Sequence, residues 1–247
     1  MWRTGDPVAI PGDYQYRALT AGPAVQRFWH GCKLELLRRV ACATARPAGR
    51  PWRALDVGCG SGVVADFLAE QGAVVDAVDS NEAAIRFARE QFPRGGLRFH
   101  LGQANAIDFP EGTFDLVVCM EVLEHLAADQ GADLLRRLGR LLAPEGQLVV
   151  TTPNTLSPWP AVEFLMDAFH LSPPMQGRQH VTRFTRGRLA RALAGAGLHV
   201  WRCGRFCGLA PFVAAVSWRL AEWSGRLEWS LGQPLGNLLY ALAGKTP

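Results

Sequence analysis

Acidic and imidazole side chains follow one another closely between Glu121 and His125, and this spacing is suited to moving a proton. If the segment is helical, Glu121, Glu124 and His125 lie on one face, because residues three and four apart are neighbours on a helix. His125 is then a candidate general base, with Glu124 beside it, for taking a proton from a hydroxyl. Alternatively, two carboxylates and an imidazole would hold a divalent cation that lowers the pKa of a substrate hydroxyl. A third interpretation gives His125 only the role of orienting the loop.

A second chemical signal is the run of alternating glycines, Gly58, Gly60 and Gly62, which follows Asp56 and a short apolar stretch. A periodic apolar segment comes next and stops at Gly72, so the region is expected to form a strand, a tight turn and a helix. Glycines in such a turn let backbone N–H groups and a helix N-terminus approach a ligand closely. The spacing differs from the G-x-G-x-x-G pattern of dinucleotide-binding turns.

An acidic residue, Asp79, ends the next expected strand about 20 residues after the glycine turn, which is the spacing that a ribose-binding carboxylate needs. The alternative is a glycine turn that binds nothing. The presence of Asp79 at this distance favours a nucleoside ligand.

These side chains need a parallel sheet to position them, and strands alternate with helices from residue 52 to about residue 152. The expected strands are Ala54–Val57, Val74–Asp79, Leu97–Leu101, Phe114–Met120, Gln147–Thr152, Leu198–Cys203 and Leu238–Lys245. The expected helices between them are Val63–Gln71, Asn81–Phe92, Gly131–Leu142 and Thr185–Ala196. In open α/β sheets, ligands bind at the carboxyl ends of the strands, where both chemical signals fall.

Over residues 52–152 this order of motifs resembles the class I S-adenosylmethionine (SAM) methyltransferases, and the segment after the fourth strand resembles the ubiquinone-biosynthesis O-methyltransferases. The resemblance implies a Rossmann-like α/β fold with seven strands, mostly parallel and the last antiparallel, helices on both faces, and insertions covering the substrate side. It implies SAM as cofactor and S-adenosylhomocysteine as product. The implied cofactor-binding residues are Asp56, Gly58, Cys59, Gly60, Gly62, Asp79, Ser80, Gln103, Ala104, Asn105 and Met120. Many family members have Asp where this chain has Gln103, so the contact to the adenine differs here.

The Glu–His segment also resembles the small-RNA 3′-terminal 2′-O-methyltransferases, in which such a cluster and a distant His bind a metal. This chain has a matching His180, followed four residues later by Phe184. The resemblance implies that a divalent cation, if one is bound, is held by Glu121, Glu124, His125 and His180.

Two units are expected, an N-terminal helical extension over residues 1–50 and the methyltransferase domain over residues 51–247. The extension is expected to lie over the site, with Tyr14, Tyr16 and Arg17 facing it. Within the domain, an insertion at about residues 155–177 is rich in proline and aromatic residues and reads as a substrate cover.

The second insertion, residues 206–236, combines Trp218, Trp223 and Trp229 with arginines, a composition typical of helices lying on a membrane surface. A homodimer interface would use the same residues. A transmembrane span is excluded by length and by Arg219 and Glu222.

The bulk composition sets limits on the class of protein. The chain has 247 residues, of which 49% are hydrophobic, enough for one large domain with a full core. The N-terminus lacks a signal-peptide core, so we expect a cytoplasmic protein, at the inner membrane face if residues 206–236 bind lipid. The six cysteines are scattered and are expected to be reduced thiols.

Charge is distributed unevenly along the chain. The net charge is +4, yet no Asp or Glu occurs from Ala168 to Ala221, where eight arginines fall. Such a basic stretch suits an anionic partner, although an arginine-rich proteome would give the same pattern. Nucleic acid is not the expected partner.

Together these features predict a SAM-dependent methyltransferase that methylates the oxygen of a lipophilic or membrane-associated hydroxyl substrate, such as a quinone precursor, a lipid or a lipid-linked glycan. Three alternatives stay open. The protein would be a soluble small-metabolite methyltransferase working as a dimer, a metal-assisted RNA 2′-O-methyltransferase, or a SAM-binding protein without catalysis.

Overall fold

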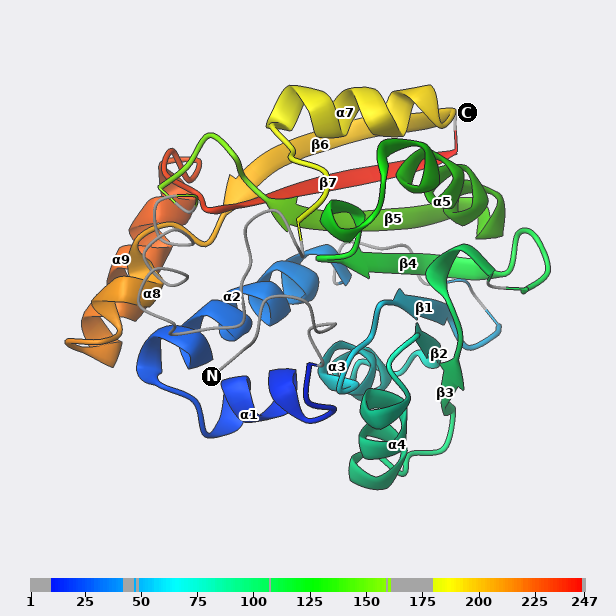
Figure 1. Ribbon diagram of the computed structural model, residues 1–247, viewed down its shortest axis with the longest axis horizontal. Helices are drawn as coiled ribbons and strands as arrows, with labels where there is room; N and C mark the ends of the chain where they lie inside the picture. Colours follow the sequence, from blue (N-terminus) through cyan, green and yellow to red (C-terminus); the bar gives the residue numbers. More distant parts are fainter. Residues whose placement is uncertain are drawn as a thin grey trace.

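A seven-stranded sheet with the order β3-β2-β1-β4-β5-β7-β6 forms the centre of the protein (Figure 1). The computed structural model describes residues 10–41, 47, 49–106, 108–158, 160 and 180–245. The strands are β1 (Arg53–Val57), β2 (Val74–Asp79), β3 (Leu97–Leu101), β4 (Phe114–Met120), β5 (Leu142–Pro153), β6 (Leu198–Phe206) and β7 (Leu238–Lys245). Strands β1 to β5 pair in parallel, whereas β7 is antiparallel to both β5 and β6. The predicted Rossmann-like fold class, with an antiparallel last strand, is confirmed.

The central strands are apolar along their length because both faces of the sheet are covered. Strand β4 is buried at every position. Two strands are longer than predicted: β5 begins at Leu142, and β6 continues to Phe206. Their extra residues pair with neighbouring strands, Leu142 opposite Phe114 and Phe206 opposite Leu238, and this pairing is tertiary information that the local pattern lacks.

Helices pack on the two faces of the sheet as separate layers (Figure 1). One core layer lies between the sheet and α2 (Ala24–Ala41), α3 (Val63–Glu70) and α4 (Glu82–Gln91). The other lies between the sheet and α5 (Ala128–Leu141) and α7 (Arg186–Gly195). The four helices predicted between the strands are present as α3, α4, α5 and α7, with boundaries that differ by at most a few residues.

The N-terminal segment forms two helices, α1 (Tyr14–Thr20) and α2. The sequence pattern suggests two separate helical pieces here, residues 24–29 and 34–40. The structure instead has one continuous helix of 18 residues. Its carboxyl-terminal half is fixed by the core contacts of Leu36, Leu37 and Val40, and these contacts stabilise the helix more than local propensity does.

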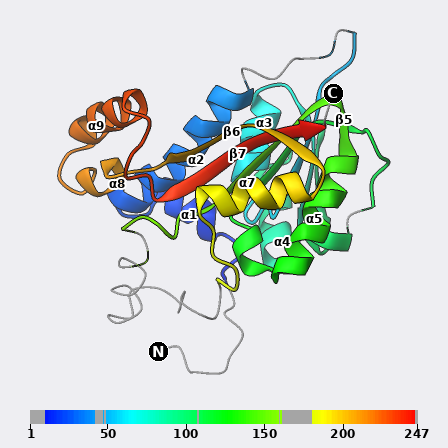
Figure 2. The ribbon, with the colours of Figure 1, turned by 90° about the horizontal axis from the view of Figure 1, so that it is seen from above.

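The connection from β6 to β7 contains α8 (Ala210–Val213) and α9 (Trp218–Ser230), so the predicted helical insertion is confirmed. Both helices stand at one end of the molecule, the end to which β1, β4 and β5 point (Figures 1 and 2). The predicted substrate cover at residues 155–177 lies outside the described residues, except for 155–158 and 160. Within the described part of the chain, no helix combines the length and apolarity that crossing a bilayer requires.

The described cysteines form no disulfide with one another: Cys32, Cys59, Cys119, Cys203 and Cys207. Their reduced state stays a prediction.

Candidate functional site

A cavity of about 890 Å³ opens at the carboxyl ends of β1, β2 and β4. Its wall brings together ten of the predicted cofactor-binding residues: Asp56, Gly58, Cys59, Gly60, Asp79, Ser80, Gln103, Ala104, Asn105 and Met120. The remaining one, Gly62, lies at the start of α3, outside the wall. The same cavity also contains Glu121 and His125, so the two chemical signals of the sequence share one space.

The glycine turn between β1 and α3 requires residues without a side chain. Gly58, Gly60 and Gly62 have φ of 75°, 49° and 84°, in the left-handed region that other residues avoid. A Cβ at Gly58 would lie 2.3 Å from Cγ2 of Val122, and one at Gly60 would lie 2.2 Å from Nε2 of Gln15. The turn therefore packs directly against neighbouring segments while its backbone stays exposed to the cavity.

Asp79 holds the glycine turn in place. Its carboxylate accepts hydrogen bonds from the backbone N–H of Gly60 at 2.7 Å and of Asn81 at 2.8 Å. A carboxylate has about four lone-pair sites. The sites that remain on Asp79, at the wall of the cavity, suit the two hydroxyls of a ribose.

Asp56 is a buried carboxyl group at the wall of the same cavity. Its Oδ2 has no hydrogen-bond partner among the described residues. Burial, followed by the nearby charge of Asp79, raises the pKa of Asp56 to about 8. A ligand ammonium group would supply both the missing partner and the missing positive charge, so the residues present fit the methionine end of SAM.

Helix α1 closes one side of the glycine turn. Gln15 accepts a hydrogen bond from the backbone N–H of Ser61 at 3.0 Å, and the Ser61 hydroxyl accepts one from the backbone N–H of Tyr16 at 2.9 Å. The N-terminal extension therefore covers the cofactor side, through Ile10, Pro11 and Gln15. No pattern in the sequence singles out Gln15.

The expectation that Tyr14, Tyr16 and Arg17 face the site is wrong. Their side chains contact other partners: Tyr14 packs on His30, Tyr16 packs on Phe87 and Phe92, and Arg17 pairs with Asp13. Successive residues of a helix point about 100° apart. The packing of α1 on α2 and α4 turns Gln15 inward and its aromatic neighbours away from the site.

Glu121 and its neighbours do not form the predicted helix. Glu121 has a left-handed backbone with φ of 56°, and only Leu123–His125 form a 3₁₀ turn, η2. The Glu121 carboxylate lies 3.4 Å from Nζ of Lys33 and accepts a hydrogen bond from Thr151 at 2.9 Å. It is therefore held by α2 and β5, away from the face that it was expected to share with Glu124 and His125.

Helix α2 contributes two basic side chains to the cavity wall, His30 and Lys33. Burial, with a smaller effect of the Lys33 charge, lowers the pKa of His30 to about 3, so its imidazole is neutral. Sequence reasoning missed both residues, because only tertiary packing brings α2 over the carboxyl ends of the strands.

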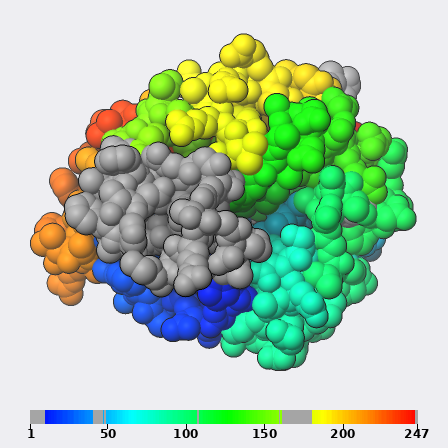
Figure 3. Space-filling model, in the orientation of Figure 1, coloured from blue at the N-terminus to red at the C-terminus, as the bar shows by residue number. Residues whose placement is uncertain are grey.

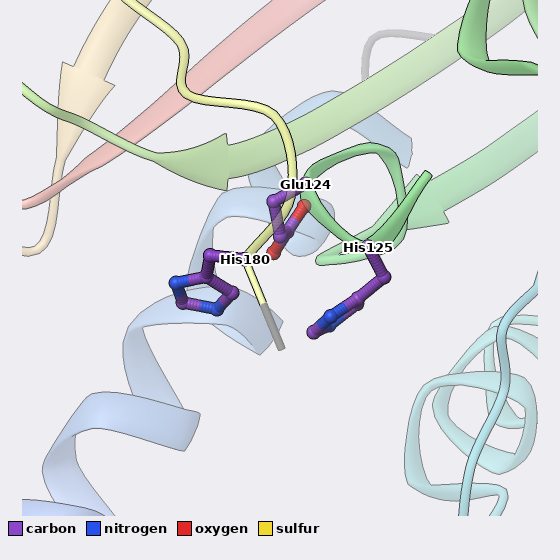
Figure 4. A group of neighbouring side chains, drawn as sticks. All are labelled: Glu124, His125 and His180. Carbon is purple, nitrogen blue, oxygen red and sulfur yellow. The ribbon is translucent and has the colours of Figure 1, made fainter. Parts of the chain in front are cut away.

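Glu124, His125 and His180 form a compact group (Figure 4). Each offers a ligand atom, and these atoms lie within 4.8 Å of one another. The backbone carbonyl of Glu124 accepts hydrogen bonds from the N–H groups of Val181 at 2.7 Å and Thr182 at 3.0 Å. These bonds bring His180 to η2 from a segment far along the chain.

Within this group, Glu124 has a shifted pKa. Burial, followed by the Glu121 charge, holds the pKa of Glu124 well above its usual range, although Thr152 donates a hydrogen bond of 3.1 Å to its carboxyl. A cation would stabilise the ionised form. One carboxylate and two imidazoles are a donor set that binds Zn²⁺ or a similar divalent ion. Three of the four predicted metal ligands, Glu124, His125 and His180, are therefore placed so that they could bind one ion. The fourth, Glu121, forms an ion pair with Lys33 instead.

The family model for a methyltransferase domain matches residues 26–202. The chain belongs to this family. The match begins within α2 and ends within β6, so α8, α9 and β7 of this methyltransferase lie outside it.

Two relatives illustrate the sequence similarity. A ubiquinone biosynthesis O-methyltransferase of Caulobacter sp. (strain K31) is 37% identical over 132 residues, which cover 50% of this chain and 52% of that protein. A probable S-adenosylmethionine-dependent methyltransferase of Mycolicibacterium smegmatis is 32% identical over 149 residues, which cover 60% of this chain and 54% of that protein. The matched part of this methyltransferase thus spans about half the length of these curated relatives.

Solved structures agree on the fold. A SAM-dependent methyltransferase from Archaeoglobus fulgidus superimposes with a TM-score of 0.65 at 20% identity, covering 94% of this chain and 99% of that one. Magnesium protoporphyrin IX methyltransferase from Synechocystis PCC 6803, with bound SAH, gives a TM-score of 0.63 at 17% identity and covers 95% and 94% of the two chains.

Proposed function

We propose that this methyltransferase transfers the methyl group of SAM to a hydroxyl oxygen of a lipophilic acceptor. The observation that carries the proposal is that one cavity holds both the cofactor turn and His125. The relatives named ubiquinone biosynthesis O-methyltransferases support oxygen as the methylated atom.

The reaction needs alignment and proton removal, because the methyl group of SAM is intrinsically electrophilic. The acceptor oxygen attacks the methyl carbon, and the carbon–sulfur bond breaks with its electron pair going to sulfur. The hydroxyl proton passes to the His125 imidazole as the new carbon–oxygen bond forms. The products are the methyl ether and S-adenosylhomocysteine.

The wall of the cavity supports a lipophilic substrate. Apolar side chains line it beside the neutral His30, namely Leu34, Val122 and Leu126. An aromatic or isoprenoid group would bury apolar surface against these residues. This burial would contribute about 25 cal/mol of binding free energy per Å² of apolar area.

A metal-assisted form of the same reaction is the second candidate, and the convergence of Glu124, His125 and His180 favours it. These three side chains would hold the cation, which when bound would lower the pKa of the acceptor hydroxyl. His125 would then serve as a ligand, and the buried Glu124 would be ionised.

Methyl transfer from labelled SAM to a panel of phenols and catechols with apolar tails tests the proposal. We expect His125→Asn to lower the rate by about 10²–10⁴-fold while SAM binding stays intact. Trp201→Gln, a change at an exposed site of β6 that is not on the cavity wall, is the control and should keep the rate. Turnover only with water-soluble acceptors would favour the small-metabolite alternative, and SAM binding without any turnover would favour the non-catalytic one.

Titration with Zn²⁺ or Mn²⁺, followed by calorimetry, separates the two forms. If the metal is part of the site, Glu124→Gln and His180→Asn should each weaken binding of the ion by at least about tenfold. Chelation should then remove activity, and the ion should restore it. Activity that survives chelation assigns His125 the role of general base.

A further inference from the structure

Helix α9 carries apolar side chains on two opposite faces. On its inner face Ala221 is buried, Trp218 packs edge-on against Phe28 at 5.1 Å between ring centroids, and Trp229 lies 6.4 Å from the Tyr240 ring. This inner face holds the helix against α2 and β7. Two of the three tryptophans that suggested a surface site are thus used for attachment.

The outer face is a separate apolar stripe. Five large apolar side chains form it, each between 43% and 86% exposed: Val216 (86%), Leu220 (54%), Trp223 (64%), Leu227 (43%) and Leu231 (65%). Their spacing of three and four residues places them in one line along α9 and its two flanks. An exposed line of large apolar side chains on a soluble surface marks an interaction site.

Two arginines border the stripe on one side. Arg219 and Arg226 are exposed and seven residues apart, so they lie along the same border of the helix. The acidic residues are engaged elsewhere: Glu228 accepts hydrogen bonds from the backbone N–H groups at the start of α8 at 2.7 and 3.1 Å, and Glu222 accepts one from the Trp218 indole at 3.0 Å. The stripe and its border therefore complement a surface that is apolar inside and anionic outside.

A membrane surface fits this face better than a second copy of the chain does. Stable protein–protein interfaces use about 20–30 residues on each side, whereas the stripe consists of side chains on and beside one helix. An amphipathic helix needs only one such face to sink about 5–10 Å into the boundary between headgroups and acyl chains. Helix α9 stands at the margin of the molecule, where a flat surface can reach it (Figures 2 and 3).

We infer that the outer face of α9 docks on an anionic phospholipid surface, with Leu220, Trp223 and Leu227 entering the bilayer and Arg219 and Arg226 meeting the headgroups. Helix α2 lies between the inner face of α9 and the cavity. One side of α2 supplies His30 and Lys33 to the cavity wall, and another side meets Trp218 through Phe28.

Co-sedimentation with phosphatidylglycerol–phosphatidylcholine vesicles tests the inference, and it does not require turnover or the proposed reaction. We expect the full chain to sediment with these vesicles and the variant Leu220→Gln/Trp223→Gln/Leu227→Gln to bind at least about tenfold more weakly. Trp201→Gln removes a tryptophan of similar exposure (48%) from the surface of β6, and it should bind as the wild type does. Retained SAM binding shows that each variant is folded.

The arginines are tested separately. Arg219→Gln/Arg226→Gln should weaken binding to the anionic vesicles by about 30-fold at low salt, because each basic residue near such a surface contributes about 1 kcal/mol. The same variant should bind pure phosphatidylcholine vesicles as weakly as the wild type does.

Two outcomes would overturn the inference. One is equal sedimentation of the wild type and the Leu220/Trp223/Leu227 variant. The other is a wild type that does not sediment with vesicles but forms a dimer, measured by light scattering, which the same variant does not form. The stripe would then be an interface between two copies.

Discussion

At the scale of single residues, the site depends on carboxyl groups whose surroundings differ. Asp79 is satisfied by two backbone N–H groups, whereas Asp56 is buried with one oxygen unpartnered. Glu121 is paired with Lys33, and burial raises the pKa of the neighbouring Glu124 well above its usual range. The four carboxyl groups therefore differ in surroundings, and each suits a different partner: ribose hydroxyls for Asp79, an ammonium group for Asp56, Lys33 for Glu121, and a cation or proton for Glu124.

The affinity for SAM should depend on pH through Asp56. The pKa of Asp56 is about 8 in the free protein, so the group is mostly protonated at pH 6 and must lose this proton to meet the ammonium group. The ligand amine itself stays charged up to about pH 7.7. Affinity should therefore rise by up to about tenfold per pH unit between pH 6 and 7.5. Calorimetry in buffers of different ionisation enthalpy should detect the released proton.

Asp56→Asn provides the control for this dependence. The variant should bind SAM about 10–100-fold more weakly at pH 7.5, because a charge-assisted hydrogen bond is lost, and its affinity should be flat over the same range. A pH slope that persists in this variant would assign the titration to another group.

At the scale of elements, the turn after β1 and the segment after β4 support each other. The Cβ-free Gly58 packs against Val122, and Val122 directly precedes η2. The cofactor turn and the candidate catalytic turn are thus in contact, so their relative position does not depend on a bound ligand. Helix α1 closes the arrangement through Gln15.

Gly58→Ala should therefore disturb both turns. The new methyl group would lie 2.3 Å from Cγ2 of Val122, in addition to the cost of a left-handed backbone. Gly112→Ala is a matched control, because its φ of 70° is similar while no described atom lies within 4 Å of the added Cβ. We expect a loss of about 1–2 kcal/mol in the free energy of unfolding for Gly112→Ala.

For Gly58→Ala we expect a larger loss of stability together with loss of SAM binding. Chemical denaturation and calorimetry measure the two effects. Equal losses of stability in both variants, with SAM binding intact, would show that Val122 moves aside freely and that the contact between the turns is unimportant.

At the scale of the whole molecule, a buried carboxylate joins strands β1, β2 and β3 through partners that are partly exposed. Asp76 on β2 is bound by Arg98 at 2.9 Å and by His100 at 2.8 Å, both from β3, and by Arg53 of β1 at 3.3 Å. Burial alone would raise the pKa of Asp76, but the hydrogen bonds and charges of Arg98 and His100 outweigh it and lower this pKa below the ordinary value. The carboxylate thus connects three parallel strands.

This network should make the protein sensitive to acid. A carboxyl group with a lowered pKa in the folded state stabilises the protein above the ordinary pKa of about 3.9, and this contribution is lost as the pH falls through the folded value. Urea unfolding between pH 7 and pH 3 should show the loss. Asp76→Asn should be less stable at pH 7 by about 2 kcal/mol and should lose less on acidification. A variant with the same pH profile as the wild type would place the acid sensitivity elsewhere, for example at Asp115, whose pKa is also lowered by Arg50.

Much of this protein could be predicted from local patterns. The bounds of β3, β4 and β7 match the prediction because short apolar runs ended by turn residues specify strands directly. The family resemblance implied the cofactor-binding residues. Parallel strands end at one edge of the sheet, and the structure places Asp56 and Asp79 in the wall of one cavity there. Their contacts with SAM stay a prediction. The expectation of reduced cysteines and the absence of a membrane span among the described helices also follow from composition.

Other features depended on tertiary structure. Glu121 leaves the expected helical face because Lys33 of α2 and Thr151 of β5 hold it, and neither is near it in sequence. Gln15 faces the site and Tyr16 does not, because the rotation of α1 is set by packing on its neighbours. The domain boundary near residue 50 stays a prediction.

The same division explains α9. The sequence determined that an apolar, tryptophan-containing insertion follows β6, since composition is a local property. Only the tertiary structure decided that Trp218 and Trp229 attach the helix while Trp223 faces outward. The physical reason is that which side of an amphipathic helix is buried depends on the surface it meets, and here that surface is formed by α2 and β7, segments distant in the chain.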